Sequence, residues 1–170
     1  MDLGTGDGRA VLARARREPA ALVVGIDASS AGMAESSLRA AKPVRKGGLP
    51  NAWFVVAAAE CPPPELAGIA AEVTVSLPWG SLLRGTLALE DAAAASAGIA
   101  NLVAPGGRIR ALVSIDARDR LDVPRPEQTP VAEIAATASS WARGLHAGRD
   151  RPAWWLELIR PAPPASRASA

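Results

Sequence analysis

Cysteine, histidine and long apolar runs are all scarce in this chain of 170 residues. Cys61 is the single cysteine, which excludes an intramolecular disulfide and leads us to expect a reducing, cytoplasmic setting. No stretch approaches the roughly 20 apolar residues that a membrane-spanning helix needs, so we expect no membrane association. The first residues, Met1 to Leu3, have neither the basic nor the apolar region of a signal peptide, and we expect none.

Charge is nearly balanced, with a net charge of +2, although 17 of the 19 basic residues are arginine. Alanine is similarly overused, and a GC-rich gene accounts for both biases without a functional cause. The arginine excess alone therefore does not indicate a nucleic-acid-binding protein. The positions of the basic residues along the chain carry more information than their number.

Short apolar runs alternate with helical stretches, which is the pattern of βαβ units and a mainly parallel sheet. A first strand is expected to end at the glycine-rich turn, and further strands at residues 21–26, 53–58, 72–77, 108–115 and 153–159. Helices are expected at residues 8–17, 29–41, 81–103 (with an interruption near Gly85) and 131–146, with a short helix after the prolines at 62–64. The prediction is one α/β domain over residues 1–160, with helices on both faces of the sheet, and a disordered tail at 161–170.

Three alternate glycines, Gly4, Gly6 and Gly8, stand between an expected strand end and the start of a helix. Without a Cβ the backbone can turn sharply there, and a ligand can lie directly against it. In an open α/β sheet such a turn lies at the carboxyl end of the first strand, where these folds bind nucleotide-like cofactors. A dinucleotide site prefers G-x-G-x-x-G. The spacing G-x-G-x-G, with Asp2 and Asp7 beside it, favours the cationic groups of S-adenosylmethionine over a phosphate cradle.

Acidic residues, namely Asp2, Asp27 and Glu60, end three successive expected strands. Asp27 comes about 20 residues after the glycine turn, where a carboxylate can accept hydrogen bonds from both hydroxyls of a ribose. Glu60 is expected beside the same crevice, near the adenosine end of a cofactor. An acidic residue after a strand is often only a helix N-cap, so it is the combination of the three that favours a cofactor site.

Six short segments occur in one order along the chain: DLGTGDGR, GID, KGGLPN, AAAE, LPWGSLLRG and SSWARGLHAGRDR. Together they resemble the aminoglycoside-resistance 16S rRNA methyltransferases of the kanamycin–apramycin type. The resemblance covers most of residues 1–118 and resumes at about 131–160. LPWGSLLRG and the last segment are specific to that family, whereas the glycine loop is shared with many methyltransferases.

The resemblance implies a Rossmann-like class I methyltransferase fold. It also implies transfer of a methyl group from S-adenosylmethionine to N1 of the adenine at position 1408, in the decoding A site. The implied partner is the 30S subunit, the implied consequence is aminoglycoside resistance, and we expect a cytoplasmic monomer without a metal.

Carried over position by position, the resemblance assigns three groups of residues. Cofactor contacts fall on Asp2, Gly4, Asp27, Ala59, Glu60, Ser81 and Ser139, to which we add Gly6 of the glycine loop. The two tryptophans that hold the target adenine fall on Trp79 and Trp141, and Arg151 joins them in the catalytic set. Residues expected to contact RNA are Arg143 and Arg149 in the last segment and Lys42, Arg45 and Lys46 in a basic loop.

The chemistry of the residues agrees with this assignment. A base inside rRNA must leave its stack before an enzyme reaches a ring nitrogen, and tryptophans can replace the lost stacking. Because N1 of adenine has a free lone pair, it needs positioning rather than a strong base. We therefore expect His146, the single histidine, to be structural. Without the resemblance, Trp141 on an apolar helical stripe would be interpreted as a core residue.

The chain also departs from the family pattern. The family has a β-hairpin and a complete first strand before the glycine loop, so we expect an N-terminal truncation, from a start codon placed too far downstream or from a fragment. Residues 119–130 are shorter than in the family, and Gly144 stands where a second arginine is common. Two alternatives stay open: a non-catalytic remnant that binds S-adenosylmethionine or rRNA, and a small-molecule methyltransferase.

Overall fold

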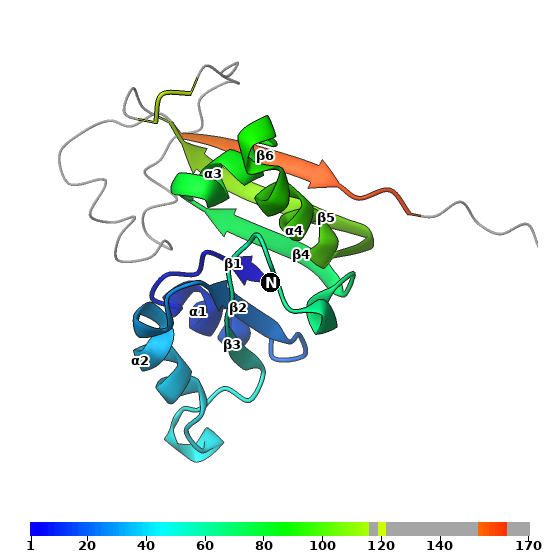
Figure 1. Cartoon of the computed structure of the whole chain (residues 1–170). Coiled ribbons are helices and arrows are strands. Elements are labelled where there is room, and N and C mark those ends of the chain that lie inside the picture. Colours follow the sequence, from blue (N-terminus) through cyan, green and yellow to red (C-terminus); the bar gives the residue numbers. More distant parts are fainter. Residues whose placement is uncertain (116–118, 122–152, 163–170) are drawn as a thin grey trace, which may run out of the picture.

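The computed structural model describes residues 1–115, 119–121 and 153–162, which build an α/β fold around one six-stranded sheet (Figure 1). The strands are β1 (Asp2–Leu3), β2 (Val23–Asp27), β3 (Ala52–Val56), β4 (Ala70–Ser76), β5 (Val103–Ser114) and β6 (Ala153–Ile159). Their order in the sheet is β3-β2-β1-β4-β5-β6. The first five are parallel, and β6 pairs antiparallel with β5. The prediction of a mainly parallel sheet is confirmed.

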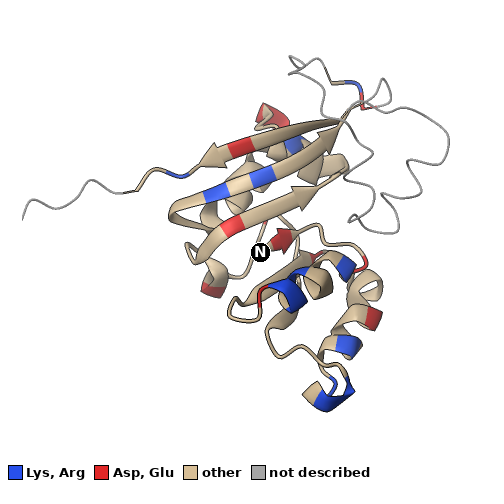
Figure 2. Ribbon diagram, turned by 180° about the vertical axis from the view of Figure 1, so that it is seen from behind, with Lys and Arg blue, Asp and Glu red and all other residues tan. Residues whose placement is uncertain are grey.

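Helices cover both faces of this sheet, as predicted. They are α1 (Arg9–Arg17), α2 (Ser30–Ala40), α3 (Gly80–Thr86) and α4 (Ala93–Leu102), with short 3-10 helices at Val44–Lys46, Pro64–Leu66 and Glu90–Ala92. The connections through α1 and α2 step along the sheet in one direction, and the connection through α3 and α4 steps in the other. Right-handed crossovers then place the two pairs on opposite faces. Figures 1 and 2, drawn from opposite sides, show α3 and α4 on one face and α1 on the other.

Two hydrophobic clusters hold the layers together. The larger one joins the central strands to α3 and α4 and includes Leu3, Val75, Leu83, Ile99 and Trp154. The smaller one packs α1 against the start of β2 and β3, through residues such as Val11, Leu12 and Val23. Burial of these side chains fixes where the carboxyl ends of β1, β2, β3 and β4 meet.

The helix predicted over residues 81–103 is interrupted, as expected, but the break lies a few residues after the expected position: the structure has α3, a 3-10 helix and α4 in that range. The chain does not break at Gly85, which is inside α3. It breaks at residues 87–89, where Ala88 has a positive φ of 55°. Gly85 instead allows α3 to pack closely on α4, since a Cβ there would come within 2.5 Å of the Ala95 Cβ. The glycine is a packing residue rather than a helix end.

The start of β5 also differs from the prediction. The predicted strand starts at residue 108, whereas β5 begins at Val103 and includes residues 105–107. Val103 pairs with Ala70, and the register shifts before Arg108 pairs with Glu72. The irregular segment includes Gly106, whose φ is 77°. The other predicted strands and the helices α1 and α2 agree with the structure to within two residues, and β6 agrees at both ends.

Candidate active site

A crevice of about 260 Å³ opens at the carboxyl ends of β1, β2, β3 and β4. This is the switch point of the sheet: the helices that connect β1, β2 and β3 cover one face, and the helices that connect β4 and β5 cover the other. Open α/β sheets bind ligands at such a point. Seven of the residues predicted from the sequence line this crevice: Gly4, Gly6, Asp27, Ala59, Glu60, Trp79 and Ser81. They come from four separate segments of the chain, which the fold brings together.

The glycine loop closes the β1 end of the crevice. The N–H of Gly4 donates to the Ile26 carbonyl at 2.8 Å, which anchors the loop to β2. A Cβ on Gly4 would lie 2.5 Å from the Cδ2 of Leu82 in α3, so a larger residue here would require the end of that side chain to shift. Gly6 has a φ of 60°, and no protein atom lies within 4 Å of the position of its Cβ. A ligand can therefore lie against the backbone at Gly6.

Asp27 at the end of β2 faces the glycine loop, and backbone N–H groups hold its carboxylate in place. Its Oδ2 accepts the N–H of Gly6 at 2.9 Å, and its Oδ1 accepts the N–H of Ser29 at 2.8 Å. Each carboxylate oxygen has two acceptor positions, so these bonds orient the group and leave acceptor capacity for a ligand. Ser29 in turn caps α2, its hydroxyl accepting the N–H of Gly32.

Glu60 and Ser81 face each other from the two sides of the crevice. Glu60 follows β3, whereas Ser81 is in the first turn of α3. A hydrogen bond from the Ser81 side chain, helped by a backbone N–H, lowers the pKa of the Glu60 carboxyl below its ordinary value. Glu60 is exposed and stays ionised near neutral pH, so it presents an anionic acceptor to the crevice.

Trp79 lies in the loop between β4 and α3 and is 75% exposed. Pro78 and Leu77, which precede it, are buried, so the tryptophan is the side chain that this loop presents to solvent. Trp154, by contrast, is 1% exposed in the core. An indole that contacts so little of its own protein is available for a partner with a flat apolar face.

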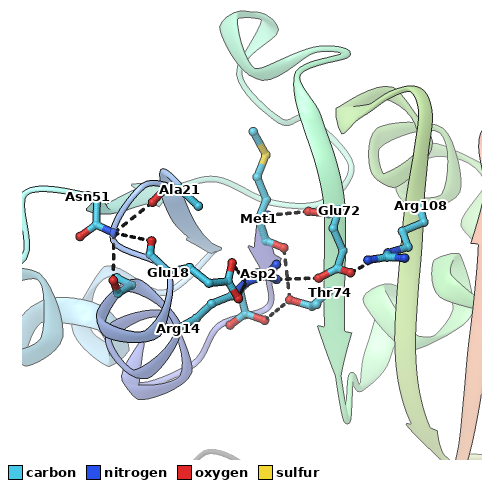
Figure 3. Close-up of polar contacts among 10 residues, drawn as sticks. Met1, Asp2, Arg14, Glu18, Ala21, Asn51, Glu72, Thr74 and Arg108 are labelled. Carbon is cyan, nitrogen blue, oxygen red and sulfur yellow. Dashed lines mark hydrogen bonds and ion pairs between the residues drawn. The ribbon is translucent and has the colours of Figure 1, made fainter.

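Asp2 is not brought together with these residues. Its side chain lines a different cleft, of about 610 Å³, beside α1 and β4. Its Oδ1 accepts a hydrogen bond from the Thr74 hydroxyl at 2.8 Å, and burial raises the pKa of the Asp2 carboxyl (Figure 3). Successive side chains of a strand point to opposite faces. Leu3 packs into the larger core cluster and Asp2 faces the other way, towards α1.

A chain of ion pairs crosses the sheet in this second cleft. Glu72 of β4 accepts from Arg14 of α1 at 2.7 Å and from Arg108 of β5 at 2.7 Å, as Figure 3 shows. Burial alone would raise the pKa of Glu72, but the two guanidinium groups outweigh it and lower that pKa. The cleft is larger than the crevice, yet its charges are largely paired with one another, which makes it a structural feature rather than a ligand site.

Asn51 is a structural residue that the sequence analysis did not single out, although it ends the KGGLPN segment. Its side-chain amide donates to the carbonyls of Ala15, Glu18 and Ala21 at 3.0, 3.1 and 3.0 Å (Figure 3). The backbone carbonyl of Asn51 accepts the N–H of Val23 at 2.8 Å. Asn51 thereby ties the end of α1 to the starts of β2 and β3, the strands whose other ends carry Asp27 and Glu60. An isolated asparagine gives no pattern that would reveal this role.

The basic loop lies apart from the crevice. Lys42, Arg45 and Lys46 are all exposed in the segment between α2 and β3, which includes the 3-10 helix Val44–Lys46. None of the three lines the crevice, and in Figure 1 this segment forms the cyan end of the molecule, opposite β6. The remaining predicted residues are Ser139, Trp141, Arg143, Arg149 and Arg151, with His146; they lie outside the described residues.

Two absences hold for the described residues, 1–115, 119–121 and 153–162. No group of three or more His, Cys, Asp or Glu side chains in these ranges is arranged to hold a metal ion. None of the helices in the same ranges is long and apolar enough to cross a membrane.

Comparison with known proteins agrees with the geometry of the crevice. The family model NpmA, 16S rRNA (adenine(1408)-N(1))-methyltransferase, matches residues 1–131. A 16S rRNA (adenine(1408)-N(1))-methyltransferase from Streptoalloteichus tenebrarius is 36% identical over 180 residues, covering 89% of this chain and 81% of the relative.

Solved structures agree as well. The crystal structure of the 16S rRNA methyltransferase KamB superposes with a TM-score of 0.81 at 32% identity, covering 95% of this chain and 86% of that one. A mutant of the Catenulisporales acidiphilia 16S rRNA (adenine(1408)-N(1))-methyltransferase, solved with the cosubstrate SAM, superposes with a TM-score of 0.78 at 30% identity. Here the coverage is 96% of this chain and 85% of that one.

Proposed function

The chain belongs to the 16S rRNA (adenine(1408)-N(1))-methyltransferase family, and from that premise we propose how its own residues carry out the reaction. The protein transfers a methyl group from S-adenosylmethionine to N1 of the adenine at position 1408 of 16S rRNA, an activity that confers aminoglycoside resistance. The observation that carries the residue assignment is the crevice at the switch point of the sheet. It combines a glycine loop, two acidic acceptors and an exposed indole.

The crevice fits S-adenosylmethionine by its donor and acceptor groups. Asp27 is oriented by two backbone N–H groups and retains acceptor positions for the ribose hydroxyls. The backbone at Gly6 is open to close approach by a ligand, and Glu60 faces the crevice from the β3 side. When bound, S-adenosylmethionine supplies the methyl group as an electrophile on its sulfonium sulfur. Acidic side chains suit that cationic cofactor better than a phosphate.

Trp79 holds the target base in this proposal. The adenine must leave the rRNA stack to expose N1, which costs stacking energy. The exposed Trp79 indole offers a flat face at the crevice, and base–aromatic stacking contributes roughly 1–3 kcal/mol. Trp79 therefore stabilises the flipped base beside the cofactor site and fixes the direction in which N1 points.

A general base is not part of the mechanism that we propose. Among the described residues, Asp27 and Glu60 are the titratable side chains that line the crevice, and both accept hydrogen bonds within the protein. N1 of adenine attacks with its own lone pair, so the side chains need only orient the base and exclude water. No observation on the described residues favours a small-molecule methyltransferase or a non-catalytic remnant.

Lys42, Arg45 and Lys46 are proposed to contact rRNA phosphates, because all three are exposed on one loop. Such contacts would make binding to the 30S subunit weaken as salt rises. We also propose that the protein acts as a monomer in the cytoplasm, where bacterial 30S subunits are found.

The direct test is primer extension across the decoding site after incubation of 30S subunits with this chain and S-adenosylmethionine. A methyl group on N1 blocks the Watson–Crick edge, so we expect a cofactor-dependent stop at the adenine at position 1408. A reaction without S-adenosylmethionine is the control for pre-existing stops. A stop at another nucleotide, or no stop with folded protein, would contradict the proposal.

A further inference from the structure

The loop that carries Trp79 is bent by a left-handed residue on each side. Leu77 has a φ of 51° and Gly80 a φ of 60°. A left-handed backbone is unfavourable for any residue with a Cβ, and bulky side chains adopt it rarely. Among the described residues, the other non-glycine positions with positive φ are Ala88 and Arg120, so Leu77 is the large apolar one. Backbone strain of this kind concentrates at functional sites.

Both ends of this bent loop are fixed to the fold. The N–H of Leu77 donates to the Leu112 carbonyl of β5 at 2.7 Å, and the Leu77 side chain is 8% exposed. Pro78 is buried, and because the residue before a proline ordinarily adopts an extended backbone, the left-handed Leu77 departs from that preference as well. After it, the Trp79 carbonyl accepts the N–H of Leu83 at 3.4 Å and caps α3. Because the exposed indole has few contacts of its own, its direction is set by the backbone on either side.

We propose that Leu77 and Gly80 are positioning residues for Trp79. Their two left-handed turns hold the indole out of the core and facing the crevice before a base arrives. This inference rests on the proposed role of Trp79 in stacking the target adenine. It adds that the backbone conformation of the loop, rather than packing around the indole, determines the fraction of protein molecules in which the indole is placed to stack on the base.

Gly80 allows this idea to be tested without disturbing the core. No atom lies within 4 Å of the position of a Gly80 Cβ, so Gly80→Ala adds a backbone cost and no collision. Leu77 is less suitable, because any change there alters a buried side chain. Gly68 is a matched control: its φ is 66° and its Cβ position is equally open, but it does not line the crevice.

The experiment measures kcat/KM for methylation of 30S subunits by the Gly80→Ala, Gly80→Asn and Gly68→Ala variants, well below their unfolding temperatures. We expect Gly80→Ala to lower kcat/KM by roughly five- to thirtyfold, the cost of one left-handed residue. The Kd for S-adenosylmethionine should change by less than about twofold. Asparagine adopts the left-handed region more readily than alanine, so Gly80→Asn should recover most of the loss. Gly68→Ala should unfold at a lower temperature yet methylate like the wild type.

Several outcomes would overturn the proposal. Wild-type kcat/KM for Gly80→Ala would show that the loop conformation does not limit the reaction. Equal losses for Gly80→Ala and Gly80→Asn would assign the effect to side-chain bulk at the RNA interface instead. The Trp79→Ala variant separates this inference from the one on which it rests. If Trp79→Ala loses the predicted activity while Gly80→Ala is fully active, only the positioning role fails. If Trp79→Ala is fully active, the stacking role fails too.

Discussion

On the β2 side of the crevice, Asp27 is fixed by two backbone N–H groups, whereas on the β4 side the Trp79 indole is 75% exposed and contacts little. The first arrangement presents a rigid, charged acceptor whose position follows from the glycine loop and the start of α2. The second presents a flat apolar surface on a loop with a strained backbone. The β2 side is suited to hydrogen-bond a cofactor, and the β4 side is suited to stack on a base that has left the rRNA helix.

The two sides of the crevice meet at β1, the shortest strand of the sheet. β1 contributes two residues, which pair with β2 on one edge and β4 on the other. Two further contacts strengthen this junction: the Gly4 backbone lies close to the Leu82 side chain, and Arg14 of α1 pairs with Glu72 of β4. The geometry of the crevice therefore depends on interactions that join the β1–β3 half to the β4–β6 half, as well as on the residues that line it.

The largest effect on the β1–β3 half is expected from Asn51→Asp. The substitution keeps the size of the side chain but turns a carboxylate towards the carbonyls of Ala15, Glu18 and Ala21. We expect a loss of about 2–4 kcal/mol in the free energy of unfolding at pH 7, from lost hydrogen bonds and a poorly compensated charge. Urea denaturation at pH 7 and pH 4 checks this.

The pH dependence and a second variant sharpen that prediction. Because carbonyl oxygens disfavour the ionised form, the folded-state pKa of the new aspartate would be raised, and the loss should shrink as the pH falls and the carboxyl becomes protonated. Asn51→Ala removes the same hydrogen bonds without adding a charge and should show a smaller loss with little pH dependence. Equal losses for both variants at both pH values would show that charge is not the cause.

Trp79→Ala tests the β4 side in isolation. Removal of the indole should lower kcat/KM for 30S methylation by about 10- to 100-fold, the value of one base-stacking contact. Trp53→Ala is the matched control, because Trp53 of β3 is also exposed, at 57%, but does not line the crevice. Full activity of Trp79→Ala in the primer-extension assay would remove the indole from the mechanism.

The smallest effect is expected at the junction between the halves, from Glu72→Gln. Loss of the carboxylate should cost about 1 kcal/mol at neutral pH, since the ion pairs with Arg14 and Arg108 are partly exposed to solvent. The pKa of Glu72 is lowered in the folded protein, so its contribution is present above its ordinary value of 4.5 and is lost as the pH falls through the folded-state pKa.

The stability difference between Glu72→Gln and the wild type should accordingly disappear in acid. Glu157→Gln serves as the comparison, because Glu157 lies 3.9 Å from Arg108 and is half exposed. Its unfolding free energy should match the wild type within error. A pH-independent difference for Glu72→Gln would mean that packing, not the ion pairs, is responsible.

Much of the β1–β3 side could be predicted from the sequence, because its chemistry is local. Gly4, Gly6 and Asp27 follow from loop spacing and from the position of an acid after a strand, and the structure places all three in the crevice. Ser29 is a predictable helix cap for the same reason. The strand pattern predicted β6 at both ends, since its mostly apolar run contains no glycine or proline and lies between Pro152 and Pro161 in the sequence.

The features that could not be predicted depend on contacts between distant segments. The direction of the Asp2 side chain follows from how β1 pairs with β4, and the triple contact of Asn51 follows from the end of α1 lying over β3. The left-handed conformation of Leu77 has no sequence pattern, because leucine rarely adopts it. The exact position of the break between α3 and α4, at Ala88, could not be predicted either, because alanine ordinarily favours a helix.

The central claim is a division of labour between the two sides of the crevice, and calorimetric titration of S-adenosylmethionine into Asp27→Ala and Trp79→Ala tests it most directly. We predict that Asp27→Ala raises the Kd by roughly 10- to 100-fold, since it loses hydrogen bonds to a charged acceptor. Trp79→Ala, which in this account is folded but methylates poorly, should bind S-adenosylmethionine within about twofold of the wild type. Equal weakening of cofactor binding in the two variants would contradict the division, because it would show that both sides hold the same ligand.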